Sequence, residues 1–381
     1  MRGPSDLLAW RSEFPAVERT VFLGSHTLAP ASRRTRAAID RFMDAWESKA
    51  SAERVWFDDV IPEMRRLESM AASIIGADPP DVALSPSVTT AIASLASALS
   101  FDEPKNEIVL SRREFPTDSL AWLAHEGRGA AVVWVDGSEA GDYTAAISDR
   151  TAAVTASRVS YLDGAVTDAA AICAAAREAG ALSVIDDFHG AGIVPVDVGE
   201  LGCDALVFGP YKYLFGTSNV GILYVRPDVA KRLRPTITGW FAQRDFFAFD
   251  GSRIDWPHSA QRFALGTPAA LSIFASAAGM SIVLDVGVAR IRERSLELTG
   301  YLIERADECG LAVRTPREPA RRGGLVAVEV PDSKRVLDSL LDRGIIVDER
   351  HGALRICPHF FNSEDDIDAL FDALAALGIG G

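Results

Sequence analysis

The sequence predicts an α/β protein with a large domain built on a mainly parallel sheet and a smaller C-terminal α+β domain. Predicted strands alternate with predicted helices through most of the chain, which is typical of a parallel sheet with crossover helices. From about Thr267 the pattern changes to long helices followed by short strands. With 381 residues and 48% hydrophobic content, the chain is long enough to build a large core. We therefore predict an N-terminal segment over 1–25, a large domain over 26–266 and a small domain over 267–381.

The strands of the predicted large domain are short apolar runs bounded by polar or turn residues. The clearest run covers 181–185 and leads directly into Asp186 and Asp187. The predicted strands are 101–109, 130–135, 151–156, 181–185 and 202–208, with helices between them that include 117–125 and 167–179. In the small domain we predict helices over 268–284, 288–310 and 364–377, and strands over 324–330 and 344–347.

Lys212 is unusual because lysine is scarce in this chain and this one lies among aromatic and apolar neighbours. Arginine supplies most of the positive charge, and the other four lysines have charged or turn-like surroundings: Lys49, Lys105, Lys231 and Lys334. Apolar surroundings disfavour the charged form of lysine and make the amine nucleophilic, as a Schiff base with a carbonyl requires. A lysine that extends its charged tip from a strand end into solvent explains the same surroundings, so this residue alone leaves both interpretations open.

Asp186 follows a predicted buried strand, and carboxylates at the carboxyl ends of strands often mark a functional site. A pyridoxal phosphate enzyme needs a carboxylate against the pyridinium nitrogen and a lysine for the aldehyde at the other end of the ring. Asp186 and Lys212 can supply both, because the predicted strand 202–208 places them after neighbouring strands. The alternative for Asp186 is a helix or turn cap, and Asp187 fits that lesser role equally well.

A phosphate-binding element is indicated by the hydroxyl-rich segment 85–90, which precedes a predicted helix. Helix N-termini bind phosphate through their free backbone N–H groups and their positive dipole end. The segment contains Ser87, Thr89 and Thr90. Taken alone, it is more simply explained as an ordinary N-cap.

These motifs together resemble the fold-type I pyridoxal phosphate enzymes of aminotransferase class V, and most closely the kynureninases. The Asp-x-x-His pattern is present at Asp186 and His189, Tyr-Lys-Tyr-Leu at 211–214, and Phe-Pro-Thr-Asp at 115–118. The resemblance covers most of the chain. It implies a large domain with a seven-stranded type of sheet, a smaller α+β domain, pyridoxal 5'-phosphate as cofactor, and Lys212 as the Schiff-base residue.

By this resemblance the cofactor is contacted by further residues of the large domain. Phe115 is the candidate ring that stacks on the cofactor, with an ordinary core phenylalanine as its alternative, and Asp118 belongs to the same motif. Thr89, Thr90 and Tyr211 would contact the phosphate, with Ser87 less certain. His189 would hold the cofactor ring or hydrogen-bond the substrate, and its alternative is a hydrogen-bonded histidine at a strand end.

The resemblance also implies a homodimer whose active sites lie at the subunit interface. Gly239-Trp240-Phe241 resembles a Gly-Trp-Trp element, and Gly266-Thr267 resembles the Gly-Thr turn that reaches the cofactor phosphate of the partner subunit. We therefore assign Trp240 and Thr267 to cofactor binding. Kynureninases commonly have asparagine at the position of Thr267, so substrate specificity can differ.

A substrate carboxylate calls for a bidentate arginine, and resemblance selects Arg355 among the many arginines. The segment 354–363 is similar to the Arg-x-x-Pro-x-x-Tyr-Asn element of these enzymes, with Phe361 in the place of the tyrosine. That change removes a hydroxyl but leaves a ring that can pack. His26 lies in a segment that approaches the active site in relatives, so it is a candidate substrate-binding residue, and a surface histidine is the alternative.

The cofactor is compatible with several reactions on a small α-amino acid. The motifs favour kynureninase-like hydrolytic cleavage of a β,γ carbon–carbon bond. The segment 348–353 has no cysteine, which argues against cysteine desulfuration, and Cys357 fits a core position better. The alternatives are a carbon–sulfur β-lyase, an epimerase of the isopenicillin N type and an aminotransferase, and outside enzymes a pyridoxal phosphate protein without turnover.

Composition argues against several other classes of protein. A net charge of −14 makes nucleic-acid binding unfavourable. The N-terminus has no apolar signal region and no apolar stretch is long enough to span a membrane, so we expect a cytoplasmic enzyme without a membrane partner. The four cysteines are widely spaced, which predicts neither a metal site nor disulfides. Gly190 and Gly192 lack the third glycine and the helix of a dinucleotide-binding motif.

Overall fold

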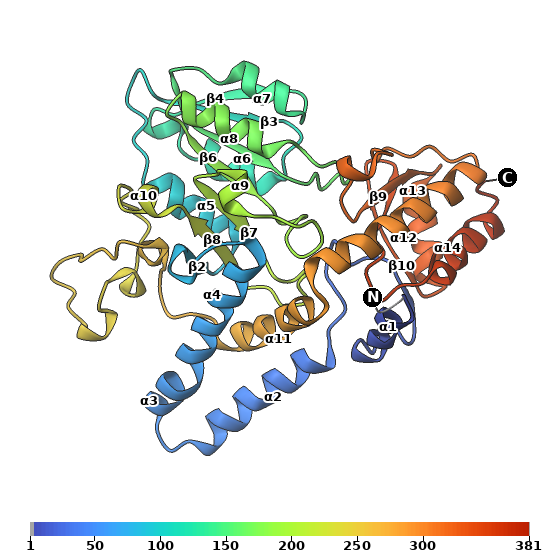
Figure 1. Ribbon diagram of the computed structural model, residues 1–381, viewed down its shortest axis with the longest axis horizontal. Helices are drawn as coiled ribbons and strands as arrows, with labels where there is room; N and C mark the ends of the chain where they lie inside the picture. Colours follow the sequence, from blue (N-terminus) through green and yellow to red (C-terminus); the bar gives the residue numbers. More distant parts are fainter. Residues whose placement is uncertain (1–3, 381) are drawn as a thin grey trace.

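A seven-stranded sheet forms the centre of the large domain in the computed structural model, which describes residues 4–380 (Figure 1). In spatial order its strands are β2 (Val82–Ser85), β8 (Gly221–Val225), β7 (Ala205–Phe208), β6 (Leu182–Asp186), β5 (Thr151–Ser157), β3 (Glu107–Ser111) and β4 (Ala131–Val135). β8 is antiparallel to both neighbours, whereas the pairs from β7 to β4 are parallel. The predicted α/β class with a mainly parallel sheet is confirmed.

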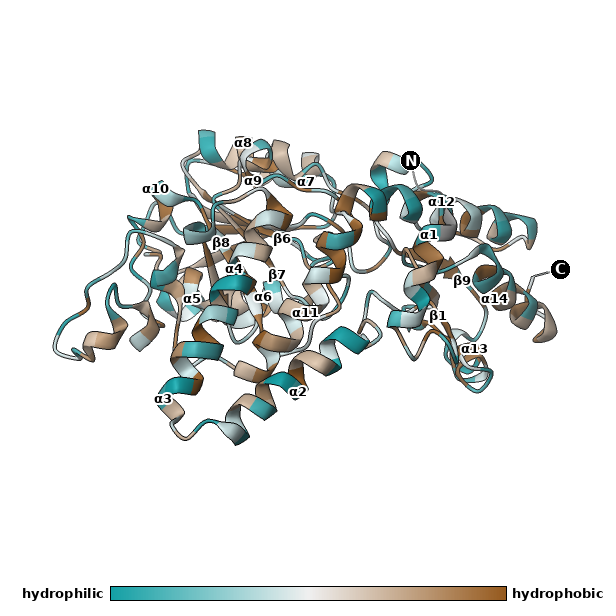
Figure 2. Cartoon of the chain, turned by 60° about the horizontal axis from the view of Figure 1, so that its bottom comes forward, coloured by the Kyte–Doolittle hydropathy of each residue, from teal (hydrophilic) through white to brown (hydrophobic). Residues whose placement is uncertain are grey.

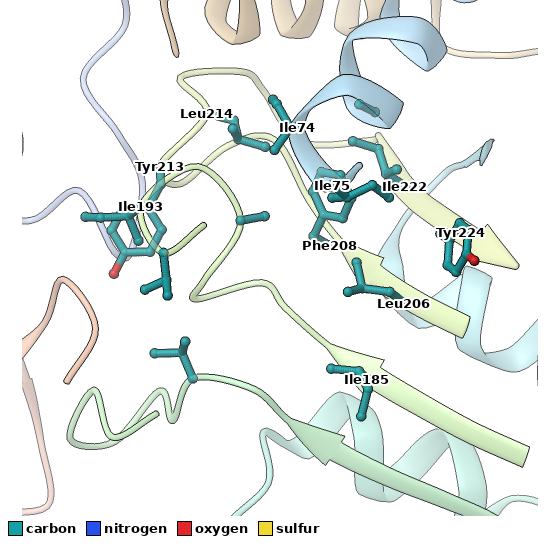
Figure 3. Packing of buried hydrophobic residues seen from close by; sticks show 14 of the residues in the cluster. Ile74, Ile75, Ile185, Ile193, Leu206, Phe208, Tyr213, Leu214, Ile222 and Tyr224 are labelled. Carbon is teal, nitrogen blue, oxygen red and sulfur yellow. The ribbon is translucent and has the colours of Figure 1, made fainter. Parts of the chain in front are cut away.

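Alternate residues of the central strands are buried in two different hydrophobic clusters, one on each face of the sheet. Ile185 and Leu206 belong to the cluster that includes Ile74 and Ile75 of α4 (Ile61–Ile75), as Figure 3 shows. Val184 belongs to the opposite cluster. Because both faces are covered by helices, these strands are apolar along their whole length, which explains why their runs are readable in the sequence.

The helices of the large domain cover both faces of this sheet. α5 (Val88–Ser97) contacts β7 and β8, while α8 (Ala169–Glu178) contacts β5 and β6. The strands are mainly hydrophobic in Figure 2, whereas α2 carries many hydrophilic residues. The remaining helices of this part are α2 (Arg33–Ser48), α3 (Ala52–Val55), α6 (Pro116–Leu123), α7 (Ala140–Ala146), α9 (Val198–Leu201) and α10 (Pro227–Ala230).

The C-terminal part contains an antiparallel sheet in the order β11 (Asp348–Arg350), β12 (Ala353–Ile356) and β9 (Val326–Glu329). Its helices are α12 (Val288–Glu308), α13 (Ser333–Leu341) and α14 (Glu364–Ala376). The N-terminal segment joins this part of the molecule. β1 (Val21–Phe22) pairs in parallel with β10 (Ile345–Ile346), and α1 (Pro4–Leu8) lies beside them in Figure 1.

α11 (Ala270–Val286) bears on the predicted division of the chain at residues 266 and 267. This helix is largely buried and packs against α2 and α4 of the large domain. Gly287, which separates it from α12, has a φ of +91°, a conformation that glycine adopts without steric cost. The division into 1–25, 26–266 and 267–381 stays a prediction, and the packing of α11 favours a boundary at Gly287.

Among residues 4–380, no single helix is long and apolar enough to cross a membrane. The bent pair α11 and α12, with 78° between the two helices, has the length and apolar composition of a membrane span, and it meets these two criteria only.

The predicted elements differ from the structure mainly at their ends. The strand predicted over 101–109 begins only at Glu107, because Lys105 N–H donates to the carbonyl of Asp102 in a preceding turn. The strand predicted over 324–330 shortens to Val326–Glu329. Strands predicted at 130–135, 151–156 and 181–185 are present with their ends shifted by a single residue.

Candidate active site

A cavity of about 260 Å³ lies where the central parallel strands end. Asp186 is the last residue of β6 and is in register with Val207 of β7, and Lys212 lies in the loop that follows β7. The fold therefore brings the two predicted residues to one cavity, at the switch-point position where open α/β sheets bind ligands. The lining consists of Pro86, Ser87, Val88, Thr89, Phe115, Thr117, Ser157, Tyr161, Asp186, Phe188, His189, Tyr211, Lys212, Ser218, Asn219 and Val220.

Lys212 is buried, and its Nζ lies 2.6 Å from Nε2 of His189. Burial lowers the pKa of Lys212 to about 8, although the negative charge of Asp186 opposes this shift. Burial and the charge of Lys212 also lower the pKa of His189 well below its ordinary value. His189 is therefore neutral, and Lys212 has an accessible free amine near neutral pH, as a nucleophilic lysine requires.

Three buried carboxyl groups, which we call the carboxylate cluster, lie together at this edge of the sheet: Glu114, Asp118 and Asp186. Asp186 accepts a hydrogen bond from the Phe188 N–H at 2.7 Å, and burial raises its pKa to about 6. Burial, followed by the charges of Asp186 and Glu114, raises the pKa of Asp118 well above its usual range. A protonated Asp118 can donate to Asp186, and its two oxygens have no other partner among residues 4–380.

Glu114 was missed by sequence reasoning, although it directly precedes Phe115. Its carboxylate accepts hydrogen bonds from the Tyr143 hydroxyl and the Ser157 hydroxyl, and from the Ser157 N–H at 3.1 Å. Burial nevertheless raises the pKa of Glu114. These hydrogen bonds hold the start of the Phe-Pro-Thr-Asp segment against the end of β5. The only signal for Glu114 in the sequence was its position next to that motif.

The N-terminus of α5 forms one wall of the cavity. Ser87 caps the helix by accepting from the Thr90 N–H at 3.0 Å, and its hydroxyl lies 2.8 Å from that of Thr90. Ser87, Val88 and Thr89 line the cavity, and the first N–H groups of a helix have no partners within it. Gly221 allows β8 to begin against this turn, since a Cβ there would lie 2.4 Å from the carbonyl carbon of Ser87. The phosphate contacts of Thr89 and Thr90 stay predictions. Thr89 lines the cavity, whereas Thr90 does not.

Aromatic rings border the cavity near Lys212. The ring of Phe188 lies 4.3 Å from Lys212 Nζ and the ring of Phe115 lies 5.9 Å from it. Phe115 is 45% exposed, which argues against an ordinary core phenylalanine. Tyr211 contacts Phe188 with 5.0 Å between ring centroids, and Tyr161 meets Phe115 edge-on at 5.3 Å. Phe115 is thus available to stack on a flat ligand, and its contact with the cofactor stays a prediction.

Arg355 and His26 lie next to this cavity, brought there by segments distant in sequence. Arg355 is on β12 and donates from Nη1 to the Tyr161 carbonyl at 2.6 Å and from Nη2 to Asp348. Nε2 of His26 lies 3.6 Å from the same Asp348 carboxylate, and its ring centroid is 6.5 Å from that of His189. His26 is completely buried, so the alternative of a surface histidine is wrong. We call His26, Asp348 and Arg355 the arginine cluster.

Trp240 and Thr267 do not line the Lys212 cavity. Trp240 is 38% exposed and borders a surface hollow with Phe246 and Phe249. Thr267 lines a neighbouring cavity of about 210 Å³, which shares Pro86, Asn219 and Val220 with the Lys212 cavity. Their predicted cofactor contacts require a partner subunit and stay predictions.

Asp187, the neighbour of Asp186, has a structural role. Its carboxylate accepts two hydrogen bonds from Arg158, at 2.7 and 2.9 Å, in a pair that is buried on both sides.

Cys357 is buried beside the Tyr213 hydroxyl at 3.5 Å, in agreement with a core position. Phe361 is fully buried and stacks on His359 with 5.5 Å between centroids, so its ring serves packing.

A buried aspartate at the end of β6 and a buried lysine in the loop after β7, beside a helix N-terminus, are the groups that a pyridoxal phosphate enzyme needs. The unpartnered His189 Nδ1 in the cavity wall and the low lysine pKa fit this group. The aminotransferase class-V family model matches residues 21–370. The chain belongs to this family, and its cofactor is pyridoxal 5'-phosphate.

Curated relatives span nearly the whole chain. It is 30% identical over 369 residues to the uncharacterized aminotransferase YcbU of Bacillus subtilis (strain 168), covering 96% of this chain and 97% of YcbU. It is 29% identical over 364 residues to the kynureninase of Pseudomonas fluorescens, covering 89% and 84% respectively.

Solved structures share the fold at lower identity. The apo cysteine desulfurase from Thermococcus onnurineus NA1 is 21% identical with a TM-score of 0.87, and 99% of this chain and 98% of that chain are covered. The cystine C-S lyase C-DES, in complex with cysteine persulfide, is 19% identical with a TM-score of 0.88, covering 97% and 100%. The predicted fold-type I architecture is thus confirmed.

Proposed function

We propose that this pyridoxal phosphate enzyme is kynureninase-like and hydrolyses a β,γ carbon–carbon bond of a small α-amino acid. The observation that carries this proposal is the Phe-Pro-Thr-Asp segment, which places Phe115 on the cavity and Asp118 against Asp186. Kynureninase relatives of 27–30% identity support it. In this reaction water adds to the γ-carbonyl carbon, the β,γ bond breaks, and the β-carbon takes a proton, so that a carboxylic acid and a shorter amino acid are released.

The side chains around the cavity suit the proton transfers of this reaction. When bound, the cofactor withdraws electrons from the substrate α-carbon. Lys212 would hold the cofactor through its amine and would serve as the general base at the substrate α-carbon. Asp186 would remain ionised against a protonated ring nitrogen. His189, which is neutral, can hydrogen-bond Lys212 or the substrate.

Arg355 is proposed as the clamp for the substrate carboxylate. It is buried next to the cavity, and its Nε has no hydrogen-bond partner among residues 4–380. An arginine donor of this kind suits a carboxylate, because charge-assisted hydrogen bonds are about twice as strong as neutral ones. His26 lies beside it and is proposed to contact the substrate.

Other reactions of the same cofactor use the same residues. A carbon–sulfur β-lyase, an epimerase and an aminotransferase would each need Lys212, Asp186 and Arg355. YcbU, which is 30% identical, is named an uncharacterized aminotransferase, which makes transamination the first of these alternatives. A pyridoxal phosphate protein without turnover is the alternative outside enzymes.

We propose a homodimer with the active site at the subunit interface, because Thr267 lies outside the Lys212 cavity in a single chain. Phe57 and Phe249 are also exposed large apolar side chains, at 46% and 75%. Light scattering of the purified protein measures the mass directly, and a monomer would contradict this proposal. A cytoplasmic location stays a prediction.

The visible absorption of the purified holoenzyme tests the reaction. L-kynurenine, L-3-hydroxykynurenine, L-cysteine derivatives and common transamination donors are added one at a time, and the product is identified wherever the cofactor band changes. Anthranilate or its hydroxylated analogue together with alanine is the expected result. A band that changes only with other amino acids would contradict the kynureninase-like proposal and favour the alternative whose product appears.

A further inference from the structure

A tight hairpin holds Asp348 opposite Arg355. β11 and β12 pair antiparallel with Asp348 in register with Arg355. The two residues between the strands, His351 and Gly352, have φ values of +53° and +85°, and positive φ at both central residues is what a two-residue hairpin turn of type I′ requires. Because directly opposite residues project from the same face of a sheet, this turn places the carboxylate against the guanidinium.

The carboxylate of Asp348 accepts three hydrogen bonds from its own chain. Its Oδ1 accepts from the Glu349 N–H at 2.5 Å and from Arg350 Nη1 at 2.8 Å. Its Oδ2 accepts from Arg355 Nη2 and lies 3.6 Å from His26 Nε2. Burial alone would raise the pKa of Asp348, but the contacts with His26 and Arg355 outweigh it and hold the pKa well below the usual range. An ionised carboxylate has about four acceptor positions, so little capacity is left for a substrate.

The guanidinium of Arg355 is held at two of its three nitrogens. Nη1 is fixed by the Tyr161 carbonyl at 2.6 Å and Nη2 by Asp348, which leaves the buried Nε without a protein acceptor among residues 4–380. Tyr161 also lines the Lys212 cavity. The planar guanidinium cannot rotate without breaking one of these contacts.

His26 depends on the same carboxylate. Burial lowers the pKa of His26 to about 4, so the ring is neutral and carries a single N–H. Neither ring nitrogen has a full hydrogen bond among residues 4–380, and Asp348 is the nearest anionic group, at 3.6 Å from Nε2. A carboxylate on that side favours the tautomer with its hydrogen on Nε2, which leaves Nδ1 as an acceptor.

We infer that Asp348 is a positioning residue that orients the Arg355 guanidinium, with its free Nε–H, and the His26 tautomer for a substrate α-carboxylate and its neighbouring atoms. This inference rests on the proposed role of Arg355 as the carboxylate clamp. Asp348 balances the charge of Arg355 before substrate arrives, so selection of a carboxylate depends on hydrogen-bond direction rather than on surplus positive charge.

The test compares two probes that differ only at the carboxyl group. L-Alanine and L-alaninamide are titrated separately into the holoenzyme, and the apparent dissociation constants are taken from the change of the cofactor band. Wild-type enzyme should bind L-alanine more tightly than the amide. In Asp348→Asn, which keeps the shape but removes the charge, this preference should fall about tenfold through weaker L-alanine binding, with the amide unaffected.

Two further variants separate positioning from a general structural effect. Asp348→Glu keeps the charge on a longer arm and should recover part of the preference. Glu349→Gln is the matched control on the same hairpin, because Glu349 accepts from Ser333 and from the Gly352 N–H and does not contact Arg355. It should retain the wild-type preference. Thermal unfolding of each variant shows that the fold is intact.

The possible failures have different signatures. If neither probe changes the wild-type band, or if Arg355→Lys keeps the wild-type preference, the proposed clamp fails and the inference falls with it. If Arg355→Lys loses the preference but Asp348→Asn keeps it, only the inference is overturned. If Asp348→Asn binds L-alanine more tightly, Asp348 competes with the substrate carboxylate, and the positioning role is wrong.

Discussion

The carboxylate cluster and the arginine cluster are both groups of ionisable side chains beside one cavity, but the chain assembles them differently. Asp186 and Ser157, to which Glu114 is bound, end adjacent strands of a single sheet. Arg355, Tyr161 and His26 come from three distant parts of the chain. A cluster at adjacent strand ends follows from local sequence patterns, whereas a cluster between domains depends on how distant segments dock.

The two clusters also differ in charge. Like-charged carboxyl groups in the carboxylate cluster raise the pKa of Asp118, in addition to burial. In the arginine cluster, opposite charges hold the pKa of Asp348 low against the effect of burial. We therefore expect the carboxylate cluster to act on the cofactor and the arginine cluster to orient a substrate group. Variants of each cluster should therefore change different kinetic parameters.

Lys212 lies between the clusters, and its removal should have the largest effect. Lys212→Ala deletes both the proposed Schiff-base amine and the proposed general base, which on its own contributes roughly 10²–10⁴-fold in rate. We expect at least that loss in kcat and a changed cofactor band in absorption spectra. A Lys212→Ala variant that converts substrate at the wild-type rate would show that Lys212 is neither the Schiff-base residue nor the general base.

Asp186→Asn should lower kcat by on the order of 10²–10³-fold, as losses of a preorganised electrostatic group do, with little change in KM. The neighbouring Asp187→Asn is the matched control. Because Asp187 is paired with buried Arg158, that variant should instead lose about 3–5 kcal/mol of unfolding free energy. Steady-state kinetics and denaturant unfolding of both variants measure the contrast, and equal kinetic losses would remove the distinction between the two aspartates.

Arg355→Lys should act mainly on KM, in contrast to Asp186→Asn. Lysine lacks the planar donor fork, so a charge-assisted hydrogen bond worth about 1.5–3 kcal/mol is lost, which corresponds to a KM increase of roughly 10–100-fold. Substrate-saturation kinetics measure this change. A decrease in kcat without a change in KM would mean that Arg355 acts on the reaction step, as proposed for Asp186, and does not bind the substrate carboxylate.

The rate at which apoprotein recovers its cofactor band should rise with pH through a midpoint near 8. Only the neutral amine attacks an aldehyde, and burial lowers the pKa of Lys212 to about 8 from an ordinary value near 10.5. Recovery should thus be about tenfold faster at pH 9 than at pH 7. Stopped-flow absorption measures this rate, and a midpoint above 10 would contradict the proposed amine environment.

Asp118→Asn should have the smallest effect on activity, because the amide keeps the shape of a carboxyl group whose pKa burial and the neighbouring carboxylates raise well above its usual range. A carboxyl whose folded pKa is raised contributes stability that is present at low pH and is lost as pH rises through the folded pKa. The variant lacks this titration, so its stability relative to wild type should increase with pH above about 4. Urea unfolding at several pH values measures this difference, and a constant difference would mean that Asp118 does not titrate in the folded protein.

The buried strands and the residues at their ends show what sequence patterns predict well. Asp186 was found because an apolar run marks the strand that ends at it, and Lys212 because lysine is scarce and this one lies among apolar and aromatic neighbours. The antiparallel direction of β8 was not predicted, since apolar character does not encode strand direction. Asp348 was missed because its importance depends on register. The sequence signal for this role was the His351-Gly352 turn. Asp348 can be placed opposite Arg355 only after that segment is recognised as a hairpin turn.

The pairing of β1 with β10 has a consequence for the order in which the protein folds during synthesis. Val21 emerges early from the ribosome, but its partner Ile345 emerges close to the end of translation. The strands of the large sheet lie between β1 and β10 in sequence, so they can already pair while β1 is still without its partner strand. The last segment to be made therefore completes both the small domain and the attachment of the first segment, and a nascent chain arrested before β10 would expose an unpaired strand edge.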